Sequence, residues 1–448
     1  TFPFSALFSF FFLFGHPRFA SAEGTSDGSE QWGYVEVGPG AHLFWWLYRS
    51  PYRIEDPSKP WPLLLWHHGG PGASGVGCGN FREIGPLDEN LQPPKFTWLR
   101  KADLLFVDSP VATGFSYVEN ESLVVKTDHE AAVDLTTLLI ELFNGNETIQ
   151  KSPLYVFAES YGGKLASALG VTALRAIEAG KLKARLGDSN FCLVTHSVSA
   201  FCSKSKLSWG PILRVISRID ENDLNQSNSL ALKIQQQLAE GKSEDATGTF
   251  LDLGQVILKY SNNVSNSAVV KEGRSSSYRY TERTSTGAGS ADSDFGSFMI
   301  GPIRKKLKII PDNVTWQGQF RLIFPATCGD SLKPRIEEVG TNLSVDSIPT
   351  RENNCLDMST KGAEAWLSKL KWDGLSSFLS EDRAPLYCGK GFTGTKGFVR
   401  SHRNLFFYWI LGAGHMPGFC HSSAEPSNQP SISLQTVGSI TQSPNQHR

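Results

Sequence analysis

The chain lacks several features that would mark whole classes of protein. Its seven cysteines include no Cys-x-x-Cys pair, which indicates neither a zinc site nor a thioredoxin-like motif, and their odd number leaves at least one thiol unpaired. A formal net charge of −1, with no basic run interleaved with aromatic residues, gives no electrostatic reason to expect nucleic acid or acidic membranes as partners. The hydrophobic content of 40% is enough for a large core, in one enlarged domain or in a core with a cap.

The N-terminus has the pattern of an export signal. Residues 3–15 are almost wholly apolar but too short to span a bilayer, and residues 20–22, Ala-Ser-Ala, form a small-x-small cleavage pattern. We predict a signal peptide over residues 1–22, a mature start near Glu23 and no membrane association after cleavage. Six sequons fit passage through the secretory pathway to an extracellular or vacuolar/lysosomal location. We expect N-glycans at Asn120, Asn146, Asn225, Asn263, Asn313 and Asn342.

The most informative segment is residues 158–163, Ala-Glu-Ser-Tyr-Gly-Gly. An apolar run at 154–157 leads into it, and a helical pattern begins at Lys164. This pattern is typical of a nucleophile elbow, a tight strand-to-helix turn that exposes a serine hydroxyl and leaves room only for small neighbours. We therefore predict that Ser160 is a nucleophile, and the alternative is a buried Ser-Tyr-Gly turn without chemistry.

Partners for Ser160 occur in the order that an α/β-hydrolase requires. Residues 69–72, Gly-Gly-Pro-Gly, follow an apolar run where this fold places the loop that donates one oxyanion-hole amide, and Tyr161 would donate the second. Residues 405–410 are typical of a buried strand and lead through Gly-Ala-Gly to His415. A histidine at this place can accept the serine proton, and the alternative is a core histidine bonded to a backbone carbonyl.

Further blocks extend the pattern over most of the chain. Residues 66–74, for example, read Trp-His-His-Gly-Gly-Pro-Gly-Ala-Ser. With these blocks the chain resembles the serine carboxypeptidase family (peptidase S10), in particular its retinoid-inducible and plant serine-carboxypeptidase-like branches. The resemblance implies an α/β-hydrolase fold, with a doubly wound, mostly parallel central sheet and an inserted helical cap. The blocks are 66–74, 106–117, 158–164, 301–307, 356–366 and 412–416.

The resemblance also implies a serine-type carboxypeptidase that releases C-terminal residues from peptides through an acyl-enzyme, without a cofactor. Ser160 would attack the scissile carbonyl, His415 would carry its proton, and Asp357 would orient the imidazole. The amides of Gly70 and Tyr161 would hold the oxyanion. The substrate is expected to be a peptide with a free C-terminal carboxylate.

In the family, a glutamate before the serine bonds the substrate's terminal carboxylate, helped by an amide side chain just before the Gly-Gly pair. Glu159 matches the glutamate, Gly69 begins the Gly-Gly pair, and His68 stands where Asn or Gln is expected. An ordinary acid at a helix N-terminus is the alternative reading of Glu159. We interpret His67 and His68 as loop residues rather than metal ligands and predict no metal site.

The expected carboxylate pair has a consequence for pH. Two carboxylates a hydrogen bond apart repel unless they share a proton, so an acidic optimum is expected. A protonated His68 would attract the substrate carboxylate directly, and protonation of a histidine is also favoured at low pH.

Strand-like and helix-like patterns divide the chain after the signal peptide into three parts. The first alternates strands with helices, as in a doubly wound sheet. The second has helical patterns at 219–242 and 249–260 and a Ser/Thr/Gly-rich tract at 275–294. We assign 23–203 to the first part of the core, 204–300 to a helical cap insertion with a flexible tract, and 301–448 to the second part of the core.

Three stretches, 190–206, 346–355 and 418–428, depart from the family's pattern, and we interpret them as translated intron sequence or mis-set exon borders. The second stretch separates a strand-like run from Asp357, which makes Asp346 the alternative triad acid. Two other functions stay open. One is an acyltransferase that moves an acyl group from a glucose ester to an alcohol with the same triad. The other is an inactive pseudoenzyme, or a misassembled gene model, that keeps only the groove.

Overall fold

The computed structural model describes most of the N-terminal half of the chain and separate segments beyond it. Described are residues 19–186 except 55, 57, 95, 96 and 160, then 191–194, 206–260 except 216 and 218, 295–318, 343–346, and 364–410 except 365, 366, 369, 371, 387–394, 396 and 404.

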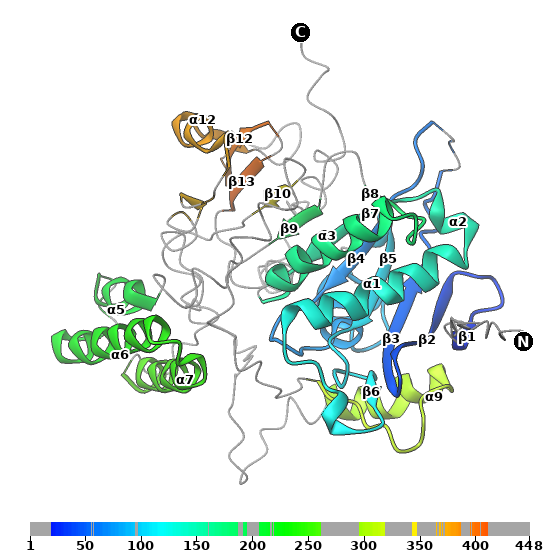
Figure 1. The fold of residues 1–448 in the computed structure, drawn as a ribbon, viewed down its shortest axis with the longest axis horizontal. Coiled ribbons are helices and arrows are strands. Elements are labelled where there is room, and N and C mark those ends of the chain that lie inside the picture. The colour runs from blue at the N-terminus through cyan, green and yellow to red at the C-terminus, as the bar shows by residue number, and fades with distance from the viewer. Residues whose placement is uncertain are drawn as a thin grey trace, which may run out of the picture.

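A central sheet of eight strands forms the core of the described fold (Figure 1). Its path is β1-β2-β3-β5-β4-β7-β8, with β6 paired to β3. Strands β5, β4, β7 and β8 are mutually parallel, whereas β1, β2, β3 and β6 pair antiparallel. The bounds are β1 Phe19–Gly24, β2 Glu30–Gly38, β3 Ala41–Tyr48, β4 Leu63–His67, β5 Asp103–Asp108, β6 Tyr117–Val118, β7 Pro153–Ala158 and β8 Arg185–Leu186.

The antiparallel edge formed by β1, β2 and β3 departs from the strand-helix alternation that we predicted from residue 23 onward. Strands β2 and β3 are joined by a short turn in which Gly40 has a φ of 73°. Because parallel neighbours need a crossover of a dozen or more residues, so short a link can only produce a hairpin. The predicted alternation holds for β4, β5 and β7, which carry the site.

Both faces of the sheet are covered, as a doubly wound fold requires. Side chains alternate along each strand, so Leu63 and Leu65 of β4 pack toward one face and Leu64 and Trp66 toward the other. The first face is covered by α1 (Asp128–Asn144) and α3 (Gly162–Glu178), which lie side by side in Figure 1. On the second face lie the π-helix η1, the π-helix η4 and helix α9, with bounds η1 Gly75–Ile84, η4 Met299–Ile303 and α9 Arg304–Leu307.

The boundary that we placed at residue 300 falls inside this packed segment. Phe295 and Met299 are buried in the same cluster as strand residues such as Trp46 and Phe106. The segment that covers the second face therefore begins at or before Phe295 rather than at 301.

Three helices at 206–260 form a separate packing unit, drawn in green in Figure 1. Helices α5 (Lys206–Val215), α6 (Glu221–Ala239) and α7 (Ser243–Tyr260) pack around their own buried residues. The predicted helices at 219–242 and 249–260 are confirmed, with α7 beginning six residues earlier; the assignment of this unit as a cap stays a prediction. Its buried residues are Leu213, Ile219, Ala231, Ile234, Ala246, Leu253 and Ile257.

The remaining elements are short. Strands β9 and β10 form a parallel pair, and β11, β12 and β13 form an antiparallel sheet that includes the predicted strand at 405–410. No helix in the described ranges is long and apolar enough to cross a membrane. The bounds are η2 Trp98–Arg100, η3 Glu121–Leu123, α2 Glu147–Gln150, β9 Phe191–Val194, β10 Leu343–Asp346, α12 Leu375–Ser380, β11 Ala384–Leu386, β12 Gly397–His402 and β13 Leu405–Ile410.

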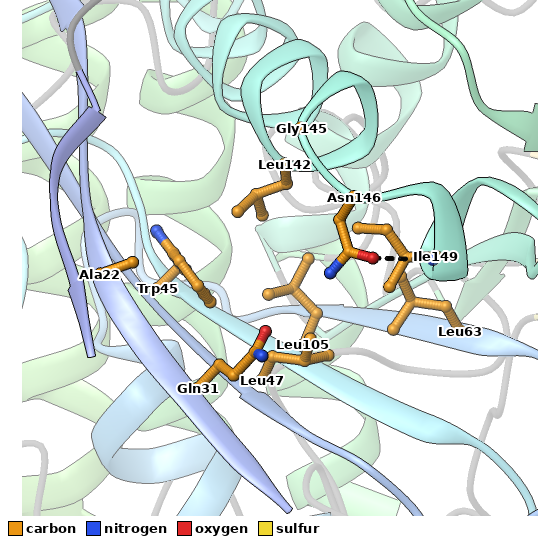
Figure 2. Close-up of a pocket in the computed structure, with 10 residues that line it drawn as sticks. All are labelled: Ala22, Gln31, Trp45, Leu47, Leu63, Leu105, Leu142, Gly145, Asn146 and Ile149. Carbon is orange, nitrogen blue, oxygen red and sulfur yellow. Dashed lines mark hydrogen bonds between the residues drawn. The ribbon is translucent and has the colours of Figure 1, made fainter. Parts of the chain in front are cut away.

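A small cavity lies between the first face of the sheet and α1. Its volume is about 120 Å³, and its walls are mostly apolar side chains such as Leu105 and Leu142 (Figure 2). Leu63, the first residue of β4, also lines it. The cavity is therefore at the amino end of β4, the end opposite to that from which the Gly-Gly-Pro-Gly loop departs.

Candidate active site

The elbow and the glycine loop meet because they follow neighbouring parallel strands. In the register of β4 and β7, His67 pairs with Ala158, and each of these residues ends its strand. The amide of Glu159 then donates to the His67 carbonyl at 3.1 Å. A Cβ added at Gly162 would lie 2.5 Å from that same carbonyl oxygen, so the start of α3 approaches the loop closely only because residue 162 is glycine.

The residues of the predicted catalytic triad, Ser160, Asp357 and His415, lie outside the described residues, and their roles stay predictions. The alternative acid, Asp346, is the last residue of β10. Of the three stretches that depart from the family, 418–428 lies wholly outside the described residues, whereas 190–206 includes strand β9, which pairs with β10.

The glycine loop has a backbone that other residues would strain. Gly70 has a φ of 113°, and a Cβ there would lie 2.8 Å from the Ala73 amide nitrogen. The turn is closed by the Ala73 amide, which donates to the Gly69 carbonyl at 3.0 Å. Gly69 is buried, whereas Gly70 is exposed to solvent. This exposure suits the predicted role of the Gly70 amide as an oxyanion donor.

The buried side chain of Asp108 stabilises the end of the glycine loop through hydrogen bonds. Its Oδ1 accepts from the Ser74 hydroxyl at 2.6 Å and from the Val76 amide at 3.0 Å, and its Oδ2 accepts from the Phe115 amide at 2.8 Å. Burial raises the pKa of Asp108 to about 6, against the opposing effect of these hydrogen bonds. The carboxyl thus joins the loop after β4 to the loop after β5.

Tyr161, the second predicted oxyanion donor, is anchored by a buried ion pair. Its hydroxyl donates to Asp128 Oδ1 at 2.9 Å, and Lys164 Nζ lies 2.7 Å from Asp128 Oδ2. The two charged side chains are only 3% and 2% exposed. This contact joins the first turn of α3 to the first turn of α1 and so fixes the backbone of the elbow. An amide at a helix N-terminus also lies where the helix dipole favours negative charge.

Beside the elbow, three ionisable side chains converge. One ligand-type atom of each of His68, Glu83 and Glu159 lies within 4.8 Å of the other two. His68 Nδ1 is 3.6 Å from Glu83 Oε2, and these two side chains are 6% and 3% exposed. Glu159 is equally buried. The cluster is polar and nearly closed to solvent, and one of its members, Glu159, directly precedes Ser160 in the sequence.

Sequence reasoning missed Glu83, which η1 carries back to the loop. A weak signal for it existed, because Glu83 directly precedes Ile84 and follows Phe81 by two residues, and both of these apolar residues belong to the core. Such an acid is either paired or functional when it is buried.

His67 differs from His68 in its position and in its hydrogen bonding. It ends β4 rather than lying in the loop, and its Nδ1 bonds the His68 carbonyl at 2.9 Å. Burial lowers the pKa of His67 to about 4, so this imidazole is neutral over most of the acidic range.

Four of the predicted glycosylation sites lie in described segments. Asn120, Asn225 and Asn313 are exposed, whereas Asn146 is half-buried and caps α2 through its Oδ1, which accepts from the Thr148 amide at 3.0 Å. Asn263 and Asn342 lie outside the described residues.

A model of the serine carboxypeptidase family matches residues 20–441. The chain belongs to this family. It is 46% identical over 443 residues to serine carboxypeptidase-like 51 of Arabidopsis thaliana, covering 94% of this chain and 93% of that protein. It is 36% identical over 436 residues to the retinoid-inducible serine carboxypeptidase of Mus musculus, covering 93% and 92%. The predicted family, and with it the assignment as a serine-type hydrolase of the peptidase class, is confirmed.

Comparison with solved structures agrees on the fold. Kex1(Δ)p, a prohormone-processing carboxypeptidase from Saccharomyces cerevisiae, superimposes with a TM-score of 0.67 at 18% identity, covering 92% of this chain and 90% of that one. At this identity the match shows the fold alone, and it confirms the predicted α/β-hydrolase class.

Proposed function

We propose that the chain removes residues one at a time from the C-terminus of peptides, with Ser160 as nucleophile and with His68, Glu83 and Glu159 as the site of the terminal carboxylate. The observation that carries the proposal is the position of this buried polar cluster directly beside the elbow. Family membership supplies the reaction class, and the cluster supplies the reason for cleavage at a chain end.

The reaction follows from the predicted roles. Ser160 Oγ bonds to the carbonyl carbon of the last peptide bond while its proton passes to His415, and Asp357 holds the imidazole. The amides of Gly70 and Tyr161 stabilise the oxyanion. The C–N bond then breaks as His415 protonates the leaving amine. Water, deprotonated by His415, then attacks the carbonyl carbon of the acyl-enzyme. His415 returns this proton to Ser160 Oγ as the ester C–O bond breaks and the shortened peptide leaves as a carboxylic acid.

The geometry of the cluster supports exopeptidase over endopeptidase action. Glu159 adjoins Ser160, and one extended residue spans about 3.5 Å. A carboxylate held by Glu159 therefore places the last peptide bond, and no other, near the nucleophile. A peptide that continued beyond this carboxylate would have to enter a nearly closed region, since the side chains of His68 and Glu83 are only 6% and 3% exposed.

The same cluster supports an acidic optimum. Adding the substrate carboxylate beside Glu83 and Glu159 gathers three acidic groups in a nearly closed space, where unscreened like charges repel strongly. Binding is then favourable only with uptake of one or more protons, by the acids or by His68. By linkage, KM should rise as pH rises. Glutamine at position 68 would remove one proton acceptor, so His68→Gln should shift this rise to lower pH.

A covalent probe tests the proposal. A fluorophosphonate should label the wild type and fail to label Ser160→Ala, and Ser160 is not the nucleophile if both are labelled equally. A wild type that is not labelled at all would favour the inactive alternative. The acyltransferase alternative is less favoured, since both relatives described above are named for carboxypeptidases. It would replace the proposal if the enzyme transferred acyl groups from glucose esters and cleaved no peptide.

We also propose that the protein enters the secretory pathway, for an extracellular or vacuolar/lysosomal destination. The apolar segment before Ala22 and the exposed sequon asparagines support this proposal. N-terminal sequencing of the mature protein should begin near Glu23, so cleavage would remove Phe19–Ala22 and leave only the last two residues of β1. Endoglycosidase treatment should lower the apparent mass of the protein. An unprocessed, unglycosylated protein from its native tissue would contradict the proposal.

A further inference from the structure

We propose that His68, Glu83 and Glu159 form a binding site for a divalent cation such as Zn²⁺, contrary to our expectation from the sequence that His68 is not a metal ligand. The bound cation inhibits the enzyme by occupying the place of the substrate carboxylate. The inhibition rests on the proposed function, whereas the binding does not. One ligand atom from each residue lies within 4.8 Å of the other two, and His68 Nδ1 lies 3.6 Å from Glu83 Oε2.

The donor set fits such an ion. Zinc binds imidazole nitrogen and carboxylate oxygen at about 2.0–2.2 Å, which places the ligand atoms of a tetrahedral site about 3.3 Å apart. The distance from His68 Nδ1 to Glu83 Oε2, 3.6 Å, is close to this value. Small side-chain rotations would bring a carboxylate oxygen of Glu159 within the same distance of these two atoms. Two carboxylates and a neutral imidazole balance a charge of 2+. Three protein ligands leave a fourth position for water.

Buried polar atoms without hydrogen-bond partners favour the binding of a cation at this site. Neither carboxylate oxygen of Glu83 has a hydrogen-bond partner among the described residues, and the same holds for His68 Nδ1. Buried polar atoms without partners cost free energy, and a shared cation would satisfy all three at once. Each of the two side chains is more than nine-tenths buried, and their unpartnered atoms face each other.

His68 makes the site selective. Imidazole is a good ligand for zinc and copper, whereas Mg²⁺ prefers six oxygen ligands and retains its water. An amide side chain, which the resemblance leads us to expect at this position, is a much poorer ligand for zinc. The proposed site is therefore a property of this chain's histidine and not of the Glu83–Glu159 pair alone.

The first test is direct binding to tag-free, chelator-treated protein at pH 6, measured by isothermal titration with ZnCl₂. Wild type should show a one-to-one site that MgCl₂ does not reproduce. His68→Gln should weaken it by more than the 10–100-fold that loss of an outer-shell partner costs, on the order of 100-fold or more. His129→Gln, which removes an exposed histidine of α1, should bind as wild type does. Thermal melts of both variants check folding.

The second test is kinetic. Zinc should raise the KM of the wild type for a peptide while leaving kcat unchanged, and it should have no such effect on His68→Gln. Equal zinc affinity in wild type and His68→Gln, or no binding by wild type, overturns the site. Zinc inhibition that lowers kcat at constant KM overturns the competition. If the protein binds zinc through His68 yet cleaves no peptide, the proposed function fails and the metal site stands.

Discussion

The buried ion pair behind the elbow offers a sharp test of the structure. Lys164 Nζ and Asp128 Oδ2 are 2.7 Å apart, and the side chains are 3% and 2% exposed. Lys164→Met keeps a long side chain in place, so the main effect is electrostatic. Removing one partner of a buried pair costs about 3–5 kcal/mol, because the other charge stays buried without compensation. The Tyr161 hydroxyl still donates to Asp128, so we expect the lower value, about 3 kcal/mol.

The matched control is an ion pair of similar length on the surface. Lys242 and Glu240 are 2.9 Å apart and are 58% and 39% exposed. Lys242→Met should leave the free energy of unfolding unchanged within error, since exposed pairs contribute little. Urea unfolding followed by tryptophan fluorescence measures both variants against wild type.

A double variant separates the charge from the packing. Adding Asp128→Asn to Lys164→Met removes the orphaned charge and should recover part of the lost stability, so the two changes are not additive. The reasoning is refuted if Lys164→Met is no more destabilising than Lys242→Met, or if the double variant is as unstable as the sum of the single ones.

Two further predictions concern residues beside the elbow, Gly162 at the start of α3 and His67 at the end of β4. Gly162→Ala should lower kcat/KM at least about tenfold and destabilise the protein, because the new Cβ would lie 2.5 Å from the His67 carbonyl oxygen. Gly248→Ala in α7, where a Cβ meets nothing within 4 Å, should be neutral or stabilising by up to about 1 kcal/mol, and equal effects at both positions would contradict the geometry. The pKa of His67 is lowered to about 4 in the folded protein, so the unfolded chain takes up a proton between pH 6.5 and 4 that the folded chain does not. The free energy of unfolding should therefore fall by about 3 kcal/mol as pH is lowered from 6.5 to 4. His67→Gln should lack this fall when unfolding is measured at each pH. Identical pH dependence in wild type and variant would show that the folded protein does not hold this imidazole buried and neutral.

The elbow and the glycine loop could be predicted because short sequence signals determine them. A nucleophile turn needs small residues two positions before and two positions after the serine, here Ala158 and Gly162. The glycine loop after β4 needs glycine at position 70, where φ is 113°. Both follow short apolar runs that are typical of buried strands, and parallel strands bring their carboxyl ends to one edge of the sheet. The contact between Glu159 and the loop after His67 follows from this arrangement.

Glu83 and the Asp128–Lys164 pair could not be predicted from their own neighbourhoods. Glu83 reaches His68 only because η1 turns the chain back over the sheet, and Asp128 meets Lys164 only because α1 and α3 pack together. These contacts depend on tertiary packing between segments far apart in sequence. The antiparallel edge was also missed, since the apolar pattern of β2 and β3 does not distinguish a hairpin from a crossover.

The most direct test of the proposed carboxylate site compares two substrates that differ at one group. A blocked dipeptide with a free C-terminus and its C-terminal amide should be cleaved by wild type at about pH 4.5, and kcat/KM measured for each. The C-terminal amide has no carboxyl group that can share a proton with the cluster, so the buried side chains of the cluster stay poorly paired when it binds. We therefore predict that kcat/KM is at least about 100-fold higher for the free acid than for the amide. The preference should shrink in Glu83→Gln. Equal cleavage of the acid and the amide by wild type would contradict the assignment of His68, Glu83 and Glu159 as the site that recognises the C-terminus.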